Sequence, residues 1–243
     1  MVFSKRPIVL LTADINEAKD GDTDQEFRLR TNYVNALYRA GAIPLVLPCT
    51  QDALEEIVQL ADGVVITGSN PGVEVAAQRV GFERRLVARC LDAGLPLLGI
   101  CHGMQLIGEQ LGGHIVRDDP LLMAAVTPHI PAAVADVLAH DVTLSHGSAL
   151  ASWADHTRVP VNSLHRHALQ HGGRYRVAAV ADDGVVEAIE GISDGFCLGV
   201  QWHPEYLLTE LDRQIMLHFV TACSNHSSQR FNVEKSEQRG DLT

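Results

Sequence analysis

Short apolar segments alternate along the first half of the chain with longer segments whose apolar residues recur at helical spacing. Four apolar segments have the length of buried strands: 7–11, 43–47, 64–66 and 96–100. The segments with helical spacing are 27–38, 54–61, 82–90 and 104–111. Strands that alternate with helices in this way predict βαβ units, and therefore a parallel sheet with helices on both faces.

The second half of the chain is richer in short apolar segments. These predict strands at 142–144, 177–180, 185–189 and 196–200, followed by a last amphipathic helix at 208–219. The acidic stretch 14–24 is predicted to form a surface loop. From Ser224 onward the chain is polar, with few apolar residues. We therefore predict one α/β domain over residues 1–222 and a disordered tail over 223–243.

Charge and composition restrict the partners of this domain. The 243 residues include 19 basic and 30 acidic residues, which gives a formal net charge of −11. Such an acidic chain is a poor partner for nucleic acid or an anionic membrane, because phosphate binding needs a basic patch. The apolar runs are far shorter than the roughly 20 residues that span a bilayer. Five scattered cysteines are not typical of a disulfide framework, so we expect a cytoplasmic protein.

The strongest local signal for chemistry is the segment 99–103, Gly-Ile-Cys-His-Gly, between a predicted strand and a predicted helix. A nucleophile in such a tight strand-to-helix turn is exposed above the sheet. The helix N-terminus favours the thiolate form of Cys101, and its free N–H groups can hold an oxyanion. The alternative interpretation is a turn of small residues around a buried cysteine.

A second segment supplies a base and a carboxylate. His203 and Glu205 follow the strand at 196–200 and are two residues apart, so both point to the same side of an extended chain. A carboxylate in this position can fix the tautomer and orientation of the imidazole. Cys101, His203 and Glu205 are therefore a candidate catalytic triad, although a salt bridge at a strand end would also explain the last two.

Three blocks of sequence carry a resemblance to a known family. They are Leu-Leu-Gly-Ile-Cys-His-Gly-Met-Gln at 97–105, Val-Asn-Ser-Leu-His-Arg-His at 161–167, and Leu-Gly-Val-Gln-Trp-His-Pro-Glu at 198–205. Weaker support comes from 33–44 and 183–190. On these residues the chain resembles the γ-glutamyl-γ-aminobutyrate hydrolase family, also called peptidase C26, among the class I glutamine amidotransferase-like proteins. The resemblance runs from about residue 7 to about residue 220.

The resemblance implies a flavodoxin-like, mostly parallel sheet with a cysteine nucleophile elbow and additional antiparallel strands in the second half. It also implies cysteine-dependent hydrolysis of γ-glutamyl amides through a γ-glutamyl thioester. Cys101 would attack the γ-carbonyl carbon. His203, oriented by Glu205, would protonate the departing amine and then activate the water that releases glutamate.

The same resemblance implies the other site residues. The oxyanion hole would consist of the N–H of His102 and an N–H of the loop that contains Ser69 and Asn70. The glycines and the proline of that loop also indicate an irregular turn at the carboxyl edge of the sheet, where open α/β sheets bind ligands. Expected substrate-binding residues are Gly68, Gln105, Asn162, Ser163 and His165.

The chain departs from the family pattern at three places. Residue 102 is His where many relatives have Arg, and residues 165–167 read His-Arg-His where His-His-Gln is usual. The stretch between Gly72 and Phe82 is shorter than in the relatives, whose loop covers the site and selects the leaving amine. The amine side of the substrate is therefore the part that the resemblance constrains least.

Three kinds of ligand are not expected. Twelve histidines, with His165 and His167 two apart, raise the question of a metal ion, but no Cys-x-x-Cys or His-Glu-x-x-His spacing is present, so we expect none. The acidic run 14–24 lacks the pattern of a calcium loop. No Gly-rich phosphate-binding fingerprint follows the first strand, and no cofactor is expected.

The expected partner is a small γ-glutamyl molecule, with a role in the breakdown of γ-glutamylated amines such as polyamine catabolism. A homodimer is possible. One alternative is a glutaminase subunit that supplies ammonia to a separate synthetase. A second alternative is a non-catalytic binding protein on the same fold, which the presence of Cys101, His203 and Glu205 disfavours.

Overall fold

The computed structural model describes residues 5–16, 25–49, 53–69, 75–116, 129, 136–170, 172–192 and 195–240, with 231–240 described only as part of a helix. The helices are α1 (Thr31–Ala40), α2 (Leu54–Leu60), α3 (Ala77–Ala93), α4 (His102–Gln110), α6 (Ala149–Trp153), the 3-10 helix η1 (Pro204–Tyr206) and α7 (Glu210–Gly240). The strands are β1 (Ile8–Thr12), β2 (Asp14–Asn16), β3 (Glu26–Arg28), β4 (Ile43–Leu47), β5 (Gly63–Ile66), β6 (Leu97–Ile100), β7 (His114–Val116), β8 (His140–Leu144), β9 (Arg158–Val161), β10 (Ala168–Gln170), β11 (Tyr175–Ala181), β12 (Val186–Gly191) and β13 (Cys197–Val200).

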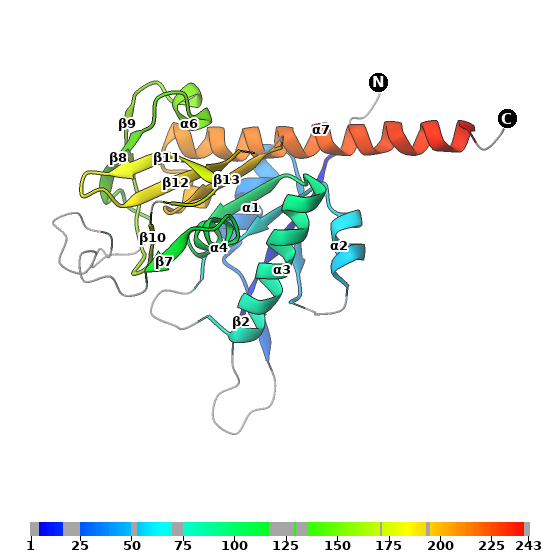
Figure 1. Ribbon diagram of the computed structural model, residues 1–243, viewed down its shortest axis with the longest axis horizontal. Coiled ribbons are helices and arrows are strands. Elements are labelled where there is room, and N and C mark those ends of the chain that lie inside the picture. Colours follow the sequence, from blue (N-terminus) through cyan, green and yellow to red (C-terminus); the bar gives the residue numbers. More distant parts are fainter. Residues whose placement is uncertain are drawn as a thin grey trace.

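One large sheet runs through the molecule in the order β4-β1-β5-β6-β13-β12-β11-β8-β9, and β10 joins it by pairing with β12 and β7 (Figure 1). The pairs from β4 to β13 are parallel, and those from β13 to β9 are antiparallel. This arrangement confirms the predicted α/β fold with a parallel sheet and additional antiparallel strands. The strand β13 connects the two parts, because it pairs with β6 on one side and with β12 on the other.

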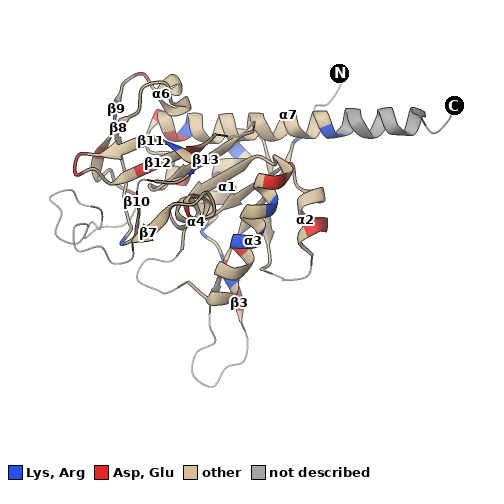
Figure 2. Cartoon of the chain, viewed as in Figure 1, with Lys and Arg blue, Asp and Glu red and all other residues tan. Residues whose placement is uncertain are grey.

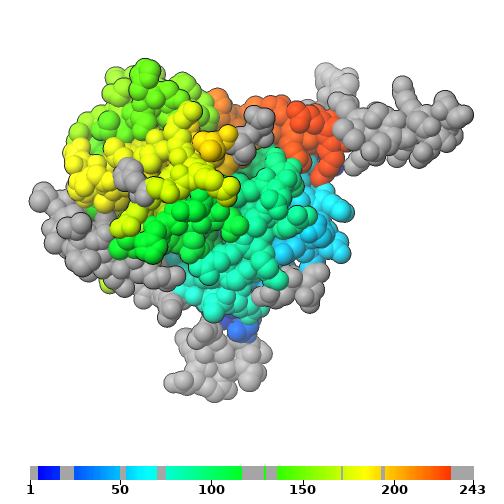
Figure 3. Space-filling view, in the orientation of Figure 1, coloured from blue at the N-terminus to red at the C-terminus, as the bar shows by residue number. Residues whose placement is uncertain are grey.

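Helices cover both faces of the parallel part. Alternate residues of β1 show this directly: Val9 and Leu11 pack in the cluster that contains residues of α1 and α7, whereas Leu10 packs in the cluster with α2, α3 and α4. Side chains of successive strand residues point to opposite faces, so the continuous apolar runs of β1, β5 and β6 are buried on both. In the space-filling view the yellow strands of the second half lie directly against the green α4 (Figure 3).

The C-terminal part differs from the prediction. A helix was expected to end near Phe219 and to be followed by a disordered tail, but α7 extends from Glu210 to Gly240. Its continuation past 222 is held by long-range contacts. Cys223 is buried and a Cβ on Gly63 would lie 2.3 Å from its sulfur, while Arg230 binds the carboxylate of Asp62 at 3.0 Å. A polar helix held by one buried cysteine and one arginine carries no apolar periodicity, so the sequence pattern did not reveal it.

The acidic stretch also differs from the predicted surface loop. Its first residues form β2, which pairs antiparallel with β3 as a separate two-stranded sheet; residues 17–24 lie outside the described part. Basic and acidic residues alternate along the ribbon of α3 in Figure 2. Among the described residues there is no helix with both the length and the apolar character needed to cross a membrane.

Candidate active site

Cys101 lies at the carboxyl end of β6 and is the residue immediately before α4. Its backbone has φ 53° and ψ −106°, a conformation that residues with a side chain adopt rarely and at an energetic cost. The turn requires both flanking glycines. A Cβ on Gly99 would lie 2.6 Å from the carbonyl group of Gly103, and a Cβ on Gly103 would lie 2.0 Å from the carbonyl oxygen of Ile66. These contacts have the form of a nucleophile elbow.

The imidazole of His203 lies beside this cysteine, after the end of the neighbouring strand β13. A Cβ on Gly68 would lie 3.0 Å from Cε1 of His203 and 3.5 Å from Cβ of Cys101, so both residues border the same glycine. Nδ1 of His203 lies 2.9 Å from Oε1 of Glu205, and both residues are buried. Nε2 of His203 is buried and has no hydrogen-bond partner of normal geometry among the described residues.

The electrostatic environment keeps a proton on His203. Burial of the ring acts to lower its pKa, but the carboxylate of Glu205 and the sulfur of Cys101 outweigh that effect and raise the pKa well above its ordinary value. Burial, Glu205 and Cys101 likewise raise the pKa of Tyr33, which is therefore a neutral phenol. The site can thus hold a cationic imidazole next to a sulfur nucleophile, which is the pairing that acyl transfer by a cysteine requires.

The backbone of His203 is fixed from two sides. The side chain of Asn162 accepts a hydrogen bond from the N–H of His203 at 2.9 Å and donates one to its carbonyl oxygen at 3.1 Å. The preceding residue, Trp202, is almost fully buried and donates its indole N–H to the carboxylate of Asp212 on α7 at 3.1 Å. The segment that presents the imidazole is therefore anchored to the loop after β9 and to the last helix.

Two glutamine side chains connect the sulfur of Cys101 to the backbone of His167. Nε2 of Gln201 lies 3.5 Å from Sγ of Cys101, and Oε1 of Gln201 accepts a hydrogen bond from Gln105 at 3.1 Å. Gln105 also donates to the carbonyl oxygen of His167 at 3.0 Å. Both glutamines are buried, so in this structure the amide of Gln105 is used to orient Gln201.

The loop after β5 is held by a buried arginine. Nη2 of Arg79 donates to the carbonyl oxygens of Thr67 and Gly68 at 3.0 and 3.2 Å. In a trans peptide the carbonyl and the following N–H point in opposite directions, so the N–H of Ser69 points away from Arg79. On the other side of the loop the N–H of Gly68 donates to the hydroxyl of Tyr33 at 3.1 Å.

The charge of Arg79 is balanced next to the elbow. Its guanidinium pairs with Asp14 and, at 2.9 Å, with Glu83, and Glu83 in turn lies 2.9 Å from the ring of His102. Burial acts to raise the pKa of Glu83, but Arg79 and His102 hold it below its ordinary value. The imidazole at position 102, where relatives often have Arg, therefore faces this buried carboxylate.

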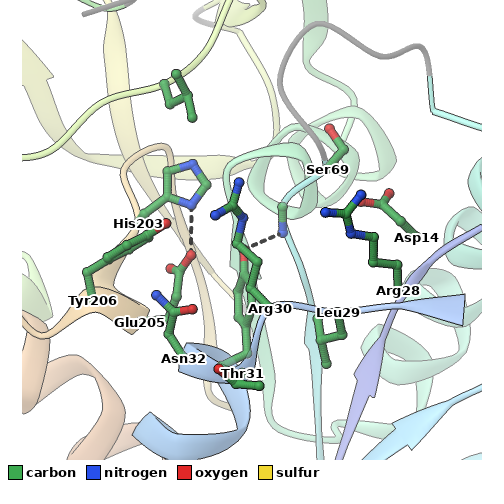
Figure 4. Close-up of a pocket in the computed structure, with 13 residues that line it drawn as sticks. Asp14, Arg28, Leu29, Arg30, Thr31, Asn32, Ser69, His203, Glu205 and Tyr206 are labelled. Atoms are coloured by element: carbon green, nitrogen blue, oxygen red, sulfur yellow. Dashed lines mark hydrogen bonds and ion pairs between the residues drawn. The ribbon is translucent and has the colours of Figure 1, made fainter. Parts of the chain in front are cut away.

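A cavity of about 360 Å³ opens in front of His203 (Figure 4). Its polar lining includes the guanidinium groups of Arg28 and Arg30, which lie at the end of β3 and just before α1. Gly68 and Ser69 form part of the same wall, as does Leu164. The cavity therefore brings two arginines to the two residues of the β5 loop that sequence analysis placed at the site. Its wall also contains the carboxylates of Asp14 and Glu205, which pair with Arg79 and His203.

The structure locates most of the residues predicted for the site. Asn70 lies outside the described residues. Ser163 and His165 are buried: the hydroxyl of Ser163 donates to the carbonyl oxygen of His129 at 2.9 Å, and the ring of His165 lies against His129. Their expected contact with substrate stays a prediction.

Several residues of the site were not predicted. They are Tyr33, Arg28, Arg30, Arg79, Gln201 and Tyr206. Gln201 belongs to the same motif as His203, so its place beside the sulfur could have been inferred. The arginines could not, because nothing in their local sequence indicates that Arg28 and Arg30 line the same cavity as His203, or that Arg79 binds the loop after β5.

A family model described as Peptidase C26 matches residues 7–205 of the chain. The chain belongs to the peptidase C26 family. Among curated proteins, it is 31% identical over 225 residues to a gamma-glutamyl-gamma-aminobutyrate hydrolase of Escherichia coli O157:H7, covering 83% of this chain and 89% of that protein. These matches support a hydrolase that acts on amide bonds.

Solved structures confirm the glutamine amidotransferase-like fold of this C26 chain. The glutaminase domain of Trypanosoma brucei CTPS with bound acivicin matches with a TM-score of 0.62 and 16% identity, over 90% of this chain and 94% of that chain. A glutamine amidotransferase from Thermotoga maritima matches with a TM-score of 0.57 and 15% identity, over 91% and 95%. At this identity the likeness concerns the fold alone.

Proposed function

We propose that the protein hydrolyses γ-glutamyl amides with Cys101 as nucleophile, His203 as general acid and base, and Glu205 as the group that orients His203. The observation that carries the proposal is the strained Cys101 at the elbow, beside a buried imidazole whose pKa is raised by Glu205 and by the cysteine itself. A backbone held in a costly conformation, next to a matched acid–base pair, is characteristic of a nucleophile position.

The reaction balances with water as the only co-substrate. The sulfur of Cys101 forms a bond to the γ-carbonyl carbon, and the carbon–nitrogen bond breaks as His203 transfers its Nε2 proton to the departing amine. His203 then takes a proton from water, whose oxygen attacks the γ-glutamyl thioester. The carbon–sulfur bond breaks, glutamate leaves, and the thiolate–imidazolium pair is restored.

Two backbone N–H groups are suited to hold the oxyanion. His102 is the first residue of α4, so its N–H has no acceptor within the helix. Ser69 lies in the cavity wall, and its N–H points away from Arg79, which holds the carbonyl of Gly68. Donors that are fixed before the reaction stabilise the developing negative charge without reorganisation.

The lining of the cavity favours a substrate with more than one carboxylate. Arg28 and Arg30 add positive charge beside His203, and guanidinium groups bind carboxylates in a bidentate manner. γ-Glutamyl-γ-aminobutyrate has one carboxylate on the glutamyl part and one on the amine part, and the named function of the E. coli relative is hydrolysis of this compound. We therefore assign γ-glutamyl amines that carry a distal carboxylate as the preferred substrates.

Glutamate release by the purified protein alone tests this proposal. The substrates are γ-glutamyl-γ-aminobutyrate, γ-glutamylbutylamine, which lacks the distal carboxylate, and glutamine. We expect the highest kcat/KM for the first. Arg30→Gln and Arg28→Gln should reduce its advantage over γ-glutamylbutylamine about tenfold, since a charge-assisted hydrogen bond from these exposed side chains contributes about 1.5 kcal/mol, the low end of its range. Arg39→Gln, on the exposed side of α1, is the matched control and should change nothing.

The same assay separates the alternatives. A glutaminase subunit, whose fold is shared with the CTPS glutaminase domain, would act on glutamine or would be inactive until a synthetase partner is added. A non-catalytic binding protein would release no glutamate from any of the three compounds. Either result would contradict the free-standing hydrolase.

A further inference from the structure

Three histidines and one glutamate from distant parts of the sequence meet behind the wall of the active site. They are His129, His140 at the start of β8, His165 after β9, and Glu187 in β12; we refer to these four residues as the imidazole cluster. Each of these side chains is at most 4% exposed. The proposed mechanism uses none of them.

The inner atoms of the cluster lie near the spacing of metal ligands, and those of His129, His140 and Glu187 are all within 4.8 Å of one another. Oε1 of Glu187 lies 3.3 Å from Nδ1 of His129, 3.4 Å from Nε2 of His165 and 3.7 Å from Nε2 of His140. Nδ1 of His129 and Nε2 of His165 are 3.2 Å apart. In a tetrahedral zinc site with bonds of about 2.0–2.1 Å, neighbouring ligand atoms lie about 3.3–3.4 Å apart.

The outer ring nitrogens fix the tautomers. Each outer nitrogen faces an oxygen acceptor: Asp183 Oδ2 at 2.8 Å for His129, the Asp141 carbonyl at 3.2 Å for His140, and the His167 carbonyl at 3.0 Å for His165. These oxygens accept hydrogen bonds, so the outer nitrogens carry the protons and the inner nitrogens of neutral rings present lone pairs. Metal-bound histidines show the same arrangement, with the second ring nitrogen donating to a carboxylate or carbonyl.

A positive charge is needed where these lone pairs converge. Glu187 is fully buried, and neither of its oxygens nor Nε2 of His140 makes a hydrogen bond of normal geometry with a described residue. A fully buried carboxylate without hydrogen bonds is costly unless a positive charge lies beside it. Lone pairs and a buried carboxylate facing one another repel unless a cation lies between them.

We propose that the imidazole cluster binds one structural zinc ion. Nitrogen and carboxylate ligands in a buried four-ligand set suit Zn²⁺, and four protein ligands leave no open position for catalysis. No metal was predicted from the sequence because no single segment contains residues at metal-ligand spacing. The four ligands come from four separate segments. The competing arrangement is an imidazolium on His129, which lies 2.8 Å from Asp183 and 3.3 Å from Glu187.

The ion would stiffen the wall that holds the catalytic imidazole. The N–H of His165 donates to the carbonyl of His129 at 3.1 Å, and the N–H of Gln201 donates to the carbonyl of Glu187 at 2.8 Å. Asn162, which holds the backbone of His203, lies three residues before His165. Zinc would therefore connect the segment 162–167 to β12 and to the strand that leads to His203.

Metal content of the full-length chain without an affinity tag tests this inference. The protein is treated with EDTA, desalted, incubated with ZnCl₂ or MgCl₂, desalted again and analysed by mass spectrometry for bound metal. We expect one zinc and no magnesium per chain, together with a zinc-dependent rise in Tm. His140→Asn, the least buried of the ligands, should lose the zinc, whereas His156→Asn, at an exposed position, should retain it.

Cobalt substitution gives a readout that does not depend on a variant. Co²⁺ in place of zinc should give the intense visible bands of tetrahedral coordination. The inference would be overturned if the wild-type protein retained much less than one zinc per chain, or if His140→Asn retained as much zinc as the wild type. The imidazole cluster would then be an ion-pair network that holds a proton in place of the metal. If His140→Asn does not fold, zinc content and the cobalt spectrum of the wild-type protein decide. None of these measurements requires activity.

Discussion

The packing of the elbow can be tested with two glycine substitutions in two helices. Gly103 is the second residue of α4, where a Cβ would lie 2.0 Å from the carbonyl oxygen of Ile66 in β5. Gly81 lies within α3, is exposed, and has nothing within 4 Å of an added Cβ. The same change, Gly→Ala, therefore adds a Cβ that meets the backbone of β5 in one helix and meets no other atom in the other.

The expected magnitudes follow from these contacts. In an unobstructed helix, alanine is more favourable than glycine by about 0.8–1.0 kcal/mol, so Gly81→Ala should raise the free energy of unfolding by about that amount. At Gly103 the same gain is opposed by a clash with backbone, which cannot rotate away. An approach of 2.0 Å to backbone sets the overpacking cost near the upper end of its usual range, about 3 kcal/mol. After the gain of about 1 kcal/mol is subtracted, Gly103→Ala should lower the free energy of unfolding by about 2 kcal/mol.

Urea denaturation followed by fluorescence gives both values, and glutamate release gives the effect on activity. Since relief of the clash must move α4 away from β5, Gly103→Ala should also displace the N–H of His102 and lower kcat at least tenfold. Gly81→Ala should leave kcat unchanged. A Gly103→Ala protein that is as stable and as active as the wild type would refute the close packing of the elbow.

Two further perturbations test the support of His203, and a third tests the attachment of the last helix. Asn162→Ala removes both hydrogen bonds to the backbone of His203. We expect kcat to fall at least tenfold, and the free energy of unfolding in urea titrations to fall by about 2–3 kcal/mol. An unchanged kcat would contradict the positioning role of Asn162. Burial raises the pKa of Asp212 to about 6. The protonated carboxyl group therefore contributes fully to the free energy of unfolding below pH 3.8, and this contribution is lost as the pH rises through 6, at about 1.4 kcal/mol per pKa unit. Asp212→Asn should remove this part of the pH dependence of stability, and a slope that persists in the variant would disprove it. Arg230→Met leaves the buried carboxylate of Asp62 without its ion pair and should lower Tm by several degrees. The control is the exposed Arg213→Met; an equal loss of Tm in this variant would show that the Arg230–Asp62 ion pair is unimportant.

The sequence predicted the parallel part of the sheet well, because strands buried on both faces produce continuous apolar runs. The segment 43–47 coincides with β4, and the runs for β1, β5 and β6 differ from the structure by about one residue at an end. The elbow was predictable for a similar reason. Gly99 and Gly103, which lie two residues before and after Cys101, are required because an added Cβ would contact α4 and β5.

The elements that were missed depend on contacts between distant segments. The strands β2 and β3 are three residues each; β2 is half-buried and β3 is exposed, so no alternation of apolar residues reveals them. The extension of α7 rests on Cys223 and Arg230 rather than on a stripe of apolar residues. The imidazole cluster was missed because its ligands come from four separate segments. The pairing of β8, β11 and β12 brings His140 and Glu187 together, and His129 and His165 come from outside these strands.

The central claim is that Cys101 forms a covalent γ-glutamyl intermediate. Its most direct test is to quench the enzyme with acid during turnover of γ-glutamyl-γ-aminobutyrate and to analyse its peptides by mass spectrometry. We expect a γ-glutamyl group on the peptide that contains Cys101, and neither adduct nor turnover in a folded Cys101→Ala protein. Turnover that persists in Cys101→Ala, or an adduct on a different residue, would contradict it.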